Sequence, residues 1–212
     1  TALLEARGLA AGHDGVSVVR DVDLAVGAGE IVAVLGANGA GKTTTMLTLA
    51  GELAPVSGEV SFLGQTSHTP LHTRAREGLA LVTEERSVFM RLTARQNIRV
   101  GGAEVEDVLR LFPELEPLLG RRAGLLSGGE QQMLTLGRAL ARKGTRVLLA
   151  DELSLGLAPK AVGRLLRAVR EAADDGLGPV LVEQHVHRVL AIADRVHVLS
   201  HGRVAYSAPA DQ

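Results

Sequence analysis

A glycine-rich segment near the start of the chain has the composition of a phosphate-binding loop. It reads Gly36-Ala37-Asn38-Gly39-Ala40-Gly41-Lys42-Thr43, which fits the pattern Gly-x-x-x-x-Gly-Lys-[Ser/Thr]. Glycines let backbone N–H groups converge on an anion, the Lys42 ammonium can reach the β and γ phosphates, and the Thr43 hydroxyl can coordinate Mg²⁺. The alternative is a glycine-rich turn that carries a lysine by chance, and the specificity of the pattern disfavours it. The segment predicts nucleotide binding by Gly36, Asn38, Gly39, Ala40, Gly41, Lys42, Thr43 and Thr44.

Two neighbouring carboxylates, Asp151 and Glu152, follow an apolar run at residues 147–150. Such a run is typical of a buried parallel strand, and a carboxylate at its C-terminal end lies on the ligand side of the sheet. Asp151 is expected to hold Mg²⁺ through water, and Glu152 to orient and deprotonate an attacking water. Acidic residues often end strands, so the pair is informative only beside the phosphate loop. Together the two motifs predict nucleotide hydrolysis, and the chain has no Asn-Lys-x-Asp run of the kind that recognises guanine.

A third segment opens a predicted helix that ends near Lys143, and it reads Leu126-Ser127-Gly128-Gly129-Glu130-Gln131-Gln132. Ser127 and Glu130 fit the Ser-x-x-Glu capping box, so a plain helix start is one interpretation. A cap does not require the two glycines, whose bare backbone at a helix N-terminus makes a second anion site. Two phosphate-sized sites in one chain imply that a site is shared across a dimer.

Strands and helices alternate around these motifs. Residues 17–26 alternate apolar and polar side chains, with Val18, Arg20, Val22, Leu24 and Val26 predicted on one face, and residues 30–35 and 180–182 are further apolar runs. Residues 42–53 have helical spacing. A second helix is predicted from Pro159 to about Asp175, with Val162, Leu165, Leu166 and Val169 buried and Arg164, Arg167 and Arg170 in water. Buried strands that alternate with helices indicate an α/β fold with a doubly wound, mainly parallel sheet.

The middle of the chain is predicted to be a helical insertion. Between about Glu84 and Lys143 the apolar spacing is almost wholly helical. We therefore expect one domain over residues 1–212, in which residues 1–83 and 144–212 form the ATP-binding core and residues 84–143 a helical subdomain.

Composition limits the class of protein. With 212 residues, 46% hydrophobic and 22% charged, the chain suits one large globular domain, and the absence of cysteine excludes disulfides and thiolate sites. A net charge of −1 argues against nucleic-acid and lipid partners. No apolar stretch approaches the ~18 to 20 residues of a membrane-spanning helix, and no secretory signal is evident. These features favour a cytoplasmic protein without direct lipid insertion.

The three motifs together resemble those of the ATP-binding cassette (ABC) ATPases. They occur in that family's order and approximate spacing, as Walker A, signature and Walker B, and the resemblance covers the whole chain. It implies the P-loop ABC-ATPase fold, with a mainly parallel core sheet, an N-terminal antiparallel β-subdomain and an inserted helical subdomain. It also implies ATP and Mg²⁺ as cofactors and a head-to-tail dimer with a second or homologous copy. In that dimer the ATP held by Lys42 of one cassette meets the other's Ser127, Gly128, Gly129 and Glu130.

Other positions of the family's site carry over by spacing. His13 stands where the family stacks an aromatic residue on adenine, although a histidine in a surface turn is the other interpretation. Glu84 stands where the family has a glutamine that ligates Mg²⁺, and a glutamate offers the same oxygen. The family's switch histidine falls on Gln184, with His185 next to it. Glutamine can bind a γ-phosphate but cannot become a cation, and which of the two residues faces ATP stays open.

Within the family, the chain most resembles the ATP-binding subunits of branched-chain amino-acid uptake systems, with urea and amide uptake ATPases close behind. The resemblance rests on residues 84–93, 122–124, 126–133 and 154–159, although Ala158 replaces the family's common aspartate. It implies a Mg²⁺-dependent ATPase that drives uptake through separate transmembrane permease subunits. The chain would then be peripheral on the inner face of the cell membrane. Phe89, Met90 and Leu92 are candidate permease contacts, and the alternative is that they belong to the core.

Two other classes share part of the pattern. Soluble ABC ATPases of translation or DNA repair typically carry tandem cassettes or a long coiled coil between Walker A and signature, but only 84 residues separate Lys42 from Ser127. A non-enzymatic ATP-gated clamp should have lost its base or its lysine, and both Glu152 and Lys42 are present. The transport ATPase is therefore the leading hypothesis.

Overall fold

The computed structural model describes residues 1–212 except 14–15, 67–68, 86, 185 and 211–212. Its centre is a six-stranded sheet in the order β10-β9-β3-β8-β7-β6. Its strands are β3 (Val32–Leu35), β6 (Leu79–Val82), β7 (Val147–Asp151), β8 (Gly178–Glu183), β9 (Arg195–Ser200) and β10 (Arg203–Pro209). Neighbouring strands are parallel except β10, which runs antiparallel to β9. The predicted mainly parallel sheet is present, and its strands end together at one edge.

The central strands are buried on both faces, which explains their continuous apolar sequence. Val32 and Val34 of β3 pack in the cluster that holds α1 (Lys42–Ala50) and the N-terminal strands. Ala33 and Leu35 pack in the cluster that holds the other helices. Side chains alternate along a strand, so a strand covered on both faces needs an apolar residue at every position.

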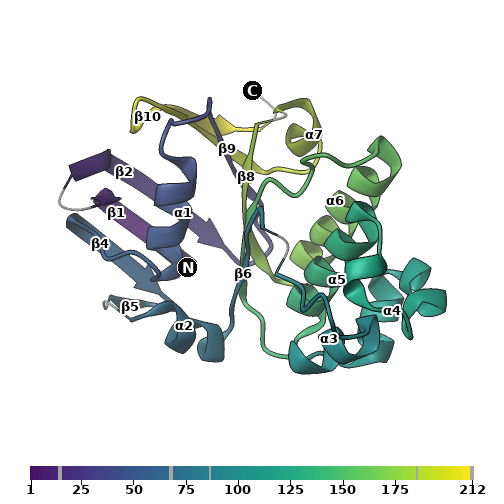
Figure 1. Cartoon of the computed structure of the whole chain (residues 1–212). Helices are drawn as coiled ribbons and strands as arrows, with labels where there is room; N and C mark the ends of the chain where they lie inside the picture. Colours follow the sequence, from purple (N-terminus) through teal and green to yellow (C-terminus); the bar gives the residue numbers. More distant parts are fainter. Residues whose placement is uncertain (14–15, 67–68, 86, 185, 211–212) are drawn as a thin grey trace.

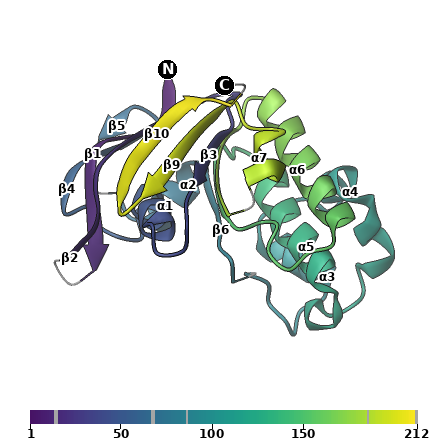
Figure 2. The ribbon, with the colours of Figure 1, turned by 90° about the horizontal axis from the view of Figure 1, so that it is seen from above.

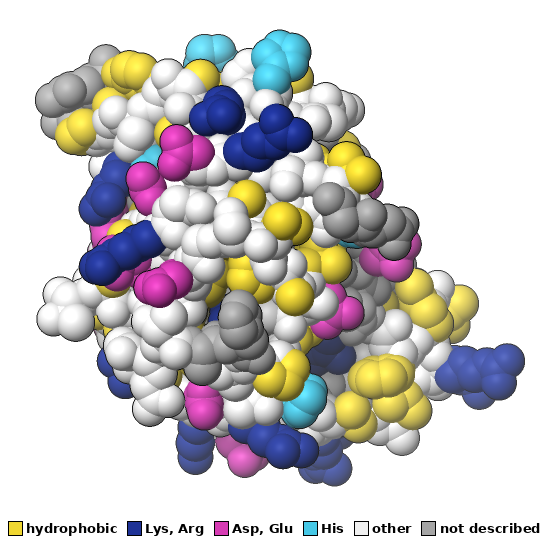
Figure 3. All heavy atoms as spheres, turned by 90° about the vertical axis from the view of Figure 1, so that its left-hand side faces the viewer, with side chains coloured by type: hydrophobic (Ala, Val, Ile, Leu, Met, Phe, Trp, Pro, Cys, Tyr) yellow, Lys and Arg dark blue, Asp and Glu magenta, His cyan; other side chains and the backbone are white. Residues whose placement is uncertain are grey.

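A second, antiparallel sheet covers one face of the central sheet. Its order is β2-β1-β4-β5, and its strands are β1 (Ala2–His13), β2 (Val16–Gly27), β4 (Ser57–Phe62) and β5 (Gln65–Thr66). Figure 1 shows this sheet on the left with α1 between the two sheets, and Figure 2 shows β9 and β10 on the side nearest to it. On the face in Figure 3, basic, acidic and apolar side chains are interspersed. The N-terminal antiparallel part is confirmed.

Helices cover the other face of the central sheet, on the right of Figure 1. They are α3 (Ala94–Val100), α4 (Val105–Leu111), η1 (Pro113–Leu118), η2 (Ala123–Leu125), α5 (Gly128–Ala141), α6 (Pro159–Asp174) and α7 (Val186–Leu190), while α2 (Leu71–Glu77) contacts β6. The region from 84 to 143 is less helical than predicted, because the described residues from 84 to 92 contain no helix. No helix of the described part is both long and apolar enough to cross a membrane.

The alternation predicted for residues 17–26 fails at its beginning. Between Val19 and Val22 the register against β1 shifts, and Asp21 takes a left-handed backbone conformation with φ of 55°. The extra residue turns Val19 into the core and leaves Val18 exposed. The prediction that Val18 and Arg20 lie on one face with Val22, Leu24 and Val26 is therefore wrong.

The arginines of α6 also depart from the prediction. The helix has the predicted start and buries the predicted apolar residues, and Arg167 is exposed as expected. Arg164 and Arg170 are instead half-buried: Arg164 pairs with Glu114 at 3.2 Å, and Arg170 with Asp194 at 2.9 Å. Both partners lie far away in sequence, so the period of the helix gives no sign of them.

Candidate functional site

The phosphate loop joins β3 to α1 at the edge where the parallel strands end. Gly41 precedes α1 with φ of 101°, and a Cβ atom there would lie 2.2 Å from Cγ1 of Val19. Such a position admits only glycine. Gly202, in the turn between β9 and β10, donates its N–H to the Ala40 carbonyl (3.1 Å) and accepts the Arg20 N–H (2.7 Å). The loop is thus held between β2 and the β9–β10 turn.

Lys42 and Thr43 begin α1, and both side chains bind within the site. The Lys42 ammonium is buried and donates to the carbonyls of Gly36 (2.8 Å) and Ala37 (3.1 Å). The Thr43 hydroxyl donates to Oδ2 of Asp151 at 2.9 Å. The Lys42 ammonium is therefore enclosed by the phosphate loop. Thr43 connects α1 to Asp151 at the end of β7.

Asp151 is a buried carboxylate with a perturbed proton affinity. Burial raises the pKa of the Asp151 carboxyl, and the negative charges of Glu152 and Glu84 raise it further. The hydrogen bond from Thr43 and the charge of Lys42 oppose this rise in pKa. Its second oxygen, Oδ1, has no hydrogen-bond partner among the described residues. An unpartnered buried carboxylate oxygen fits a group whose natural partner is a cation.

The oxygen atoms around Asp151 suit Mg²⁺ as a shared ligand. Thr43 and Asp151 are bonded to each other, and the Glu84 charge acts on Asp151. Among the described residues no group of three His, Cys, Asp or Glu side chains is arranged to hold a metal by itself. Mg²⁺ characteristically takes one or two protein carboxylates and completes its octahedron with water and substrate phosphates. The residues present therefore fit a Mg²⁺ ion that arrives with a nucleotide.

Glu152 lies directly after β7 in an unusual backbone conformation. Its φ is +48°, a left-handed value that costs a non-glycine residue roughly 1 to 2 kcal/mol. Its N–H donates to the Val182 carbonyl at 2.8 Å, and its Oε1 accepts a hydrogen bond from Nε2 of Gln184. Glu152, directly after β7, is thereby bonded to β8 through its backbone N–H and to Gln184 through its carboxylate.

These parts meet in one cavity of about 510 Å³, which we call the nucleotide cavity. It is lined by Val18, Asn38, Gly39, Gly41, Lys42, Thr43, Thr44, Glu84, Glu152, Leu155 and Gln184. Most residues expected to bind nucleotide or metal in one chain are therefore together. Gly36 and Ala40 complete the loop without lining the cavity, and Asp151 lies beneath it, bonded to Thr43.

The signature residues lie elsewhere. Ser127 caps α5, accepting the Glu130 N–H at 3.4 Å, and Oε2 of Glu130 accepts the Ser127 N–H at 2.7 Å. This is the capping box that the sequence predicts. Ser127, Gly128, Gly129 and Glu130 do not line the nucleotide cavity of their own chain.

Two further candidates are not brought to the cavity. His13 is exposed at the end of β1, opposite Val16, and does not line the cavity. His185 lies outside the described residues. In this conformation the side chain that contacts Glu152 is Gln184.

Val18 and Leu155 line the cavity although the sequence did not single them out. Val18 faces the cavity because of the register shift in β2, which strict alternation could not indicate. Leu155 follows the Asp-Glu pair by three residues, and its N–H donates to the Glu152 carbonyl at 3.1 Å. Its position depends on that turn, and the sequence offered only a leucine shortly after a carboxylate pair as a signal.

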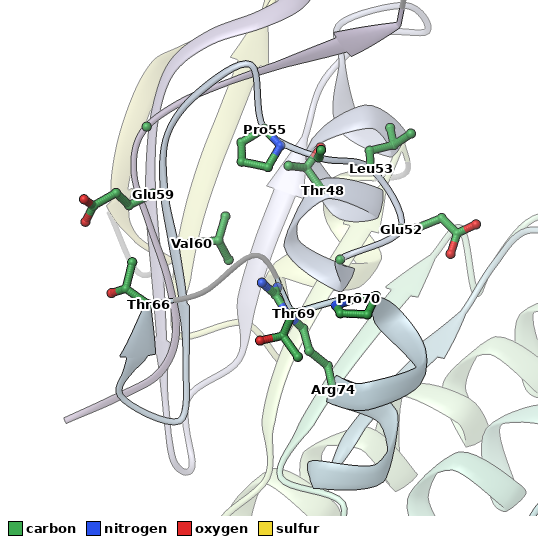
Figure 4. Close-up of a pocket in the computed structure, with 13 residues that line it drawn as sticks. Thr48, Glu52, Leu53, Pro55, Glu59, Val60, Thr66, Thr69, Pro70 and Arg74 are labelled. Atoms are coloured by element: carbon green, nitrogen blue, oxygen red, sulfur yellow. The ribbon is translucent and has the colours of Figure 1, made fainter.

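A second cavity, of about 460 Å³, lies between α1, α2 and the N-terminal sheet (Figure 4). Arg74 extends from α2 toward the end of α1 and donates to the Leu49 carbonyl at 2.5 Å. Burial lowers the pKa of the Arg74 guanidinium. The cavity shares no lining residue with the nucleotide cavity and contains none of the predicted site residues.

Lowering the pH should weaken activation by Mg²⁺ already where an ordinary aspartate would stay ionised. Because the pKa of Asp151 is raised, this carboxylate is protonated at a pH where an ordinary aspartate stays ionised, and a protonated carboxyl binds Mg²⁺ poorly. We expect the free Mg²⁺ concentration for half-maximal ATPase activity to rise as the pH falls. Glu84→Gln removes a charge that raises this pKa but keeps an oxygen ligand, so the rise should begin at lower pH. A Mg²⁺ requirement that is independent of pH would contradict the prediction.

Comparison with known proteins agrees with this architecture. The family model described as ABC transporter matches residues 19–154, more than half of the chain. The high-affinity branched-chain amino acid transport ATP-binding protein BraG of Pseudomonas aeruginosa is 41% identical over 199 residues, 89% of this chain and 85% of the relative. The lipopolysaccharide export system ATP-binding protein LptB of Escherichia coli K12 is 34% identical over 223 residues, 99% of this chain and 92% of the relative.

The fold is that of solved ATP-binding subunits. A structure titled "Structure of ATP binding subunit of ABC transporter" superposes with a TM-score of 0.87 at 29% identity, covering 99% of this chain and 90% of that one. The predicted P-loop ABC-ATPase fold is therefore confirmed. The motifs, the fold and the relatives agree, and the chain belongs to the ABC transporter family as one of its ATPase subunits.

Proposed function

We propose that this chain hydrolyses ATP to drive the uptake of branched-chain amino acids through a separate transmembrane permease. The observation that carries the ATPase part is the nucleotide cavity, where the phosphate loop, Asp151, Glu152 and Gln184 come together. The name of the relative with 41% identity supports the substrate class. Export of lipopolysaccharide, which the name of the 34% relative suggests, is the alternative. Uptake of urea or amides, driven by the same ATP hydrolysis, is a further alternative.

The residues of the cavity divide the work of hydrolysis. Backbone N–H groups of residues 36–41 and the N-terminus of α1 hold the phosphates, and Lys42 exchanges the Gly36 and Ala37 carbonyls for phosphate oxygens. Thr43, Glu84 and Asp151 would hold a Mg²⁺ ion, which would supply positive charge to neutralise the phosphates. Glu152 accepts a proton from the attacking water while Gln184 orients its carboxylate through Oε1.

A complete site requires a second copy of the chain or a homologous one. The signature residues lie outside the nucleotide cavity of their own chain, yet the N-terminus of α5 has the glycine backbone of an anion site. In a head-to-tail dimer, Ser127 and Gly129 of each copy contact the ATP bound to the other. Two identical sites follow from the two-fold symmetry of such a pair.

The permease docks on the side of the molecule where α3 and α5 meet β6. A groove of about 470 Å³ lies there, lined by Leu71, Ala75, Val82, Phe89, Val100 and Ala139 among others. Phe89 is 53% and Met90 50% exposed, so both aromatic and thioether side chains are available to a partner, whereas Leu92 is half-buried. Exposed apolar residues beside an apolar groove suit a cytoplasmic helix of the permease. Docking of this kind places the chain on the inner face of the membrane.

The helical part of the chain forms the moving unit between these two surfaces. Residues 84–143 carry both the exposed Phe89 and Met90 and the capped N-terminus of α5. Residues 1–83 and 144–212 carry the phosphate loop and the catalytic carboxylates. This division connects the permease contact to the signature within one subdomain, so permease motion and site closure are coupled.

Uptake measured in the native host tests the proposed substrate. Replacement of the chain by its Glu152→Gln variant should abolish uptake of labelled leucine, isoleucine and valine, because the variant still assembles but does not turn over. The wild-type chain, reintroduced in the same way, is the control. Normal amino-acid uptake together with defective lipopolysaccharide export would support the export function instead. A loss of urea uptake alone would support the urea and amide function.

A further inference from the structure

A buried carboxylate outside the assigned roles lies next to the site. Glu183 is the last residue of β8 and is only 3% exposed. Its Oε1 accepts the Ser154 N–H at 3.1 Å, and its Oε2 accepts the Ser154 hydroxyl at 2.8 Å. Ser154 is also 3% exposed, so the pair is shielded from water and the two hydrogen bonds fix it in one geometry.

This pair is the middle member of three contacts between the end of β8 and the segment after β7. The Val182 carbonyl accepts the Glu152 N–H at 2.8 Å, Glu183 binds Ser154, and Gln184 donates to the Glu152 side chain. Hydrogen bonds to residues 182–184 therefore hold both the first and the last residue of the segment 152–154. Val182 and Glu183 at the end of β8 and Gln184 directly after it hold them.

The attachment matters because the backbone of Glu152 is strained. Its left-handed φ of +48° is unfavourable for a residue with a Cβ atom, and such conformations persist only where the surroundings impose them. The Glu183–Ser154 pair holds the chain two residues beyond the strained position. Without it, residues 152–154 could relax to an ordinary conformation and turn the Glu152 carboxylate out of the cavity.

We propose that Glu183 is a positioning residue that acts through Ser154 to aim the Glu152 carboxylate into the nucleotide cavity. The inference rests on the proposed function, in which Glu152 is the general base. Glu183 also joins the end of β8, next to Gln184, to the turn that contains Leu155, another residue of the cavity. Neither Glu183 nor Ser154 lines the cavity, so its effect falls on turnover and not on ATP binding.

Three substitutions test this role, measured as kcat, KM for ATP and equilibrium ATP affinity. Glu183→Ala should lower kcat by about 10- to 100-fold, the scale of a misplaced catalytic group, with ATP affinity within about 3-fold of wild type. Ser154→Ala keeps the backbone hydrogen bond and should lower kcat less. Glu183→Gln should retain most activity, since its amide oxygen accepts the Ser154 N–H and its NH₂ can donate to the hydroxyl.

A matched control separates positioning from loss of stability. Asp194 also accepts a backbone N–H, that of Ile31 at 2.7 Å, at the opposite end of the parallel strands. Asp194→Ala should lower the thermal midpoint but leave kcat of the folded enzyme unchanged. If Glu183→Ala does not fold, Ser154→Ala and Glu183→Gln still provide the comparison.

The double variant Glu183→Ala with Glu152→Gln gives the sharpest result. If Glu183 acts through Glu152, the double variant should be no slower than Glu152→Gln alone. A further fall in rate, an unchanged kcat in Glu183→Ala or Ser154→Ala, or equal losses in kcat and ATP affinity would overturn the inference. Failure of the proposed function is recognised separately, by a wild-type chain without ATPase activity or a Glu152→Gln variant with normal turnover.

Discussion

Glu152→Gln should lower ATP turnover by about 100- to 10,000-fold, the usual contribution of a general base. The substitution keeps the size of the side chain but removes its ability to accept a proton from water. The hydrogen bonds of Lys42 and Thr43 described above do not involve this side chain, so ATP affinity should change little. The measurement is phosphate release under saturating Mg²⁺-ATP, beside an equilibrium titration with the nucleotide.

In the proposed dimer, hydrolysis reopens the pair, so the same variant should also trap an ATP-bound dimer. Size-exclusion chromatography with and without ATP detects this species. Glu171→Gln, an exposed carboxylate on α6, is the matched control and should behave as wild type. Near-normal turnover of Glu152→Gln would assign the base to another residue.

Lys42→Ala should weaken ATP binding by about 10- to 150-fold, from the loss of a charge-assisted contact worth ~1.5 to 3 kcal/mol. The buried ammonium is the cation inside the loop, and its two hydrogen bonds to the Gly36 and Ala37 carbonyls also shape the loop. Equilibrium dialysis with labelled ATP measures the affinity. Lys143→Ala changes an exposed lysine after α5 and should have no effect. Unchanged affinity in the Lys42 variant would remove this residue from the site.

The Lys42→Ala chain also tests whether the signature acts across the dimer. Ser127→Arg should be inactive alone, but a mixed dimer of the two variants keeps one intact site, made of Lys42 from one chain and Ser127 from the other. With random pairing about half of the dimers are mixed, so the mixture should recover about a quarter of wild-type turnover. Complete absence of recovery would mean that each site is formed within one chain.

Local patterns predicted much of the fold and of the site. The phosphate loop, the Asp151–Glu152 pair and the capped start of α5 were found from residue type and spacing alone, since each depends on a short segment. The start of α6 followed from Pro159 at its first position, and the buried strands followed from their apolar runs. Turn glycines and helix caps express their requirements locally, which makes them visible in a sequence.

The rest depends on contacts between distant segments. Val18 reaches the cavity because β2 shifts register at Asp21, and a single added residue reverses which side chains face inward. Arg164 is half-buried because its guanidinium pairs with Glu114 of another element. In the sequence, Glu183 is simply the residue after an apolar run. Its contact with Ser154, in the turn after β7, is visible only in the structure. Neither the hydrophobic periodicity nor a motif of a single segment predicts such contacts between distant segments.

The contacts that hold the phosphate loop have a consequence for biosynthesis. The loop follows β3, whose two neighbours in the sheet are β8 and β9, and its Ala40 carbonyl accepts the N–H of Gly202. The first of these partners, β8, begins at Gly178, which is 135 positions after Thr43 at the end of the loop. Contacts of such long range form late and slowly. The loop therefore emerges after β2 but before β8, β9 and Gly202 have been made. Competence to bind nucleotide therefore arises only after residues 178–202 have been translated and have paired with β3 and the loop.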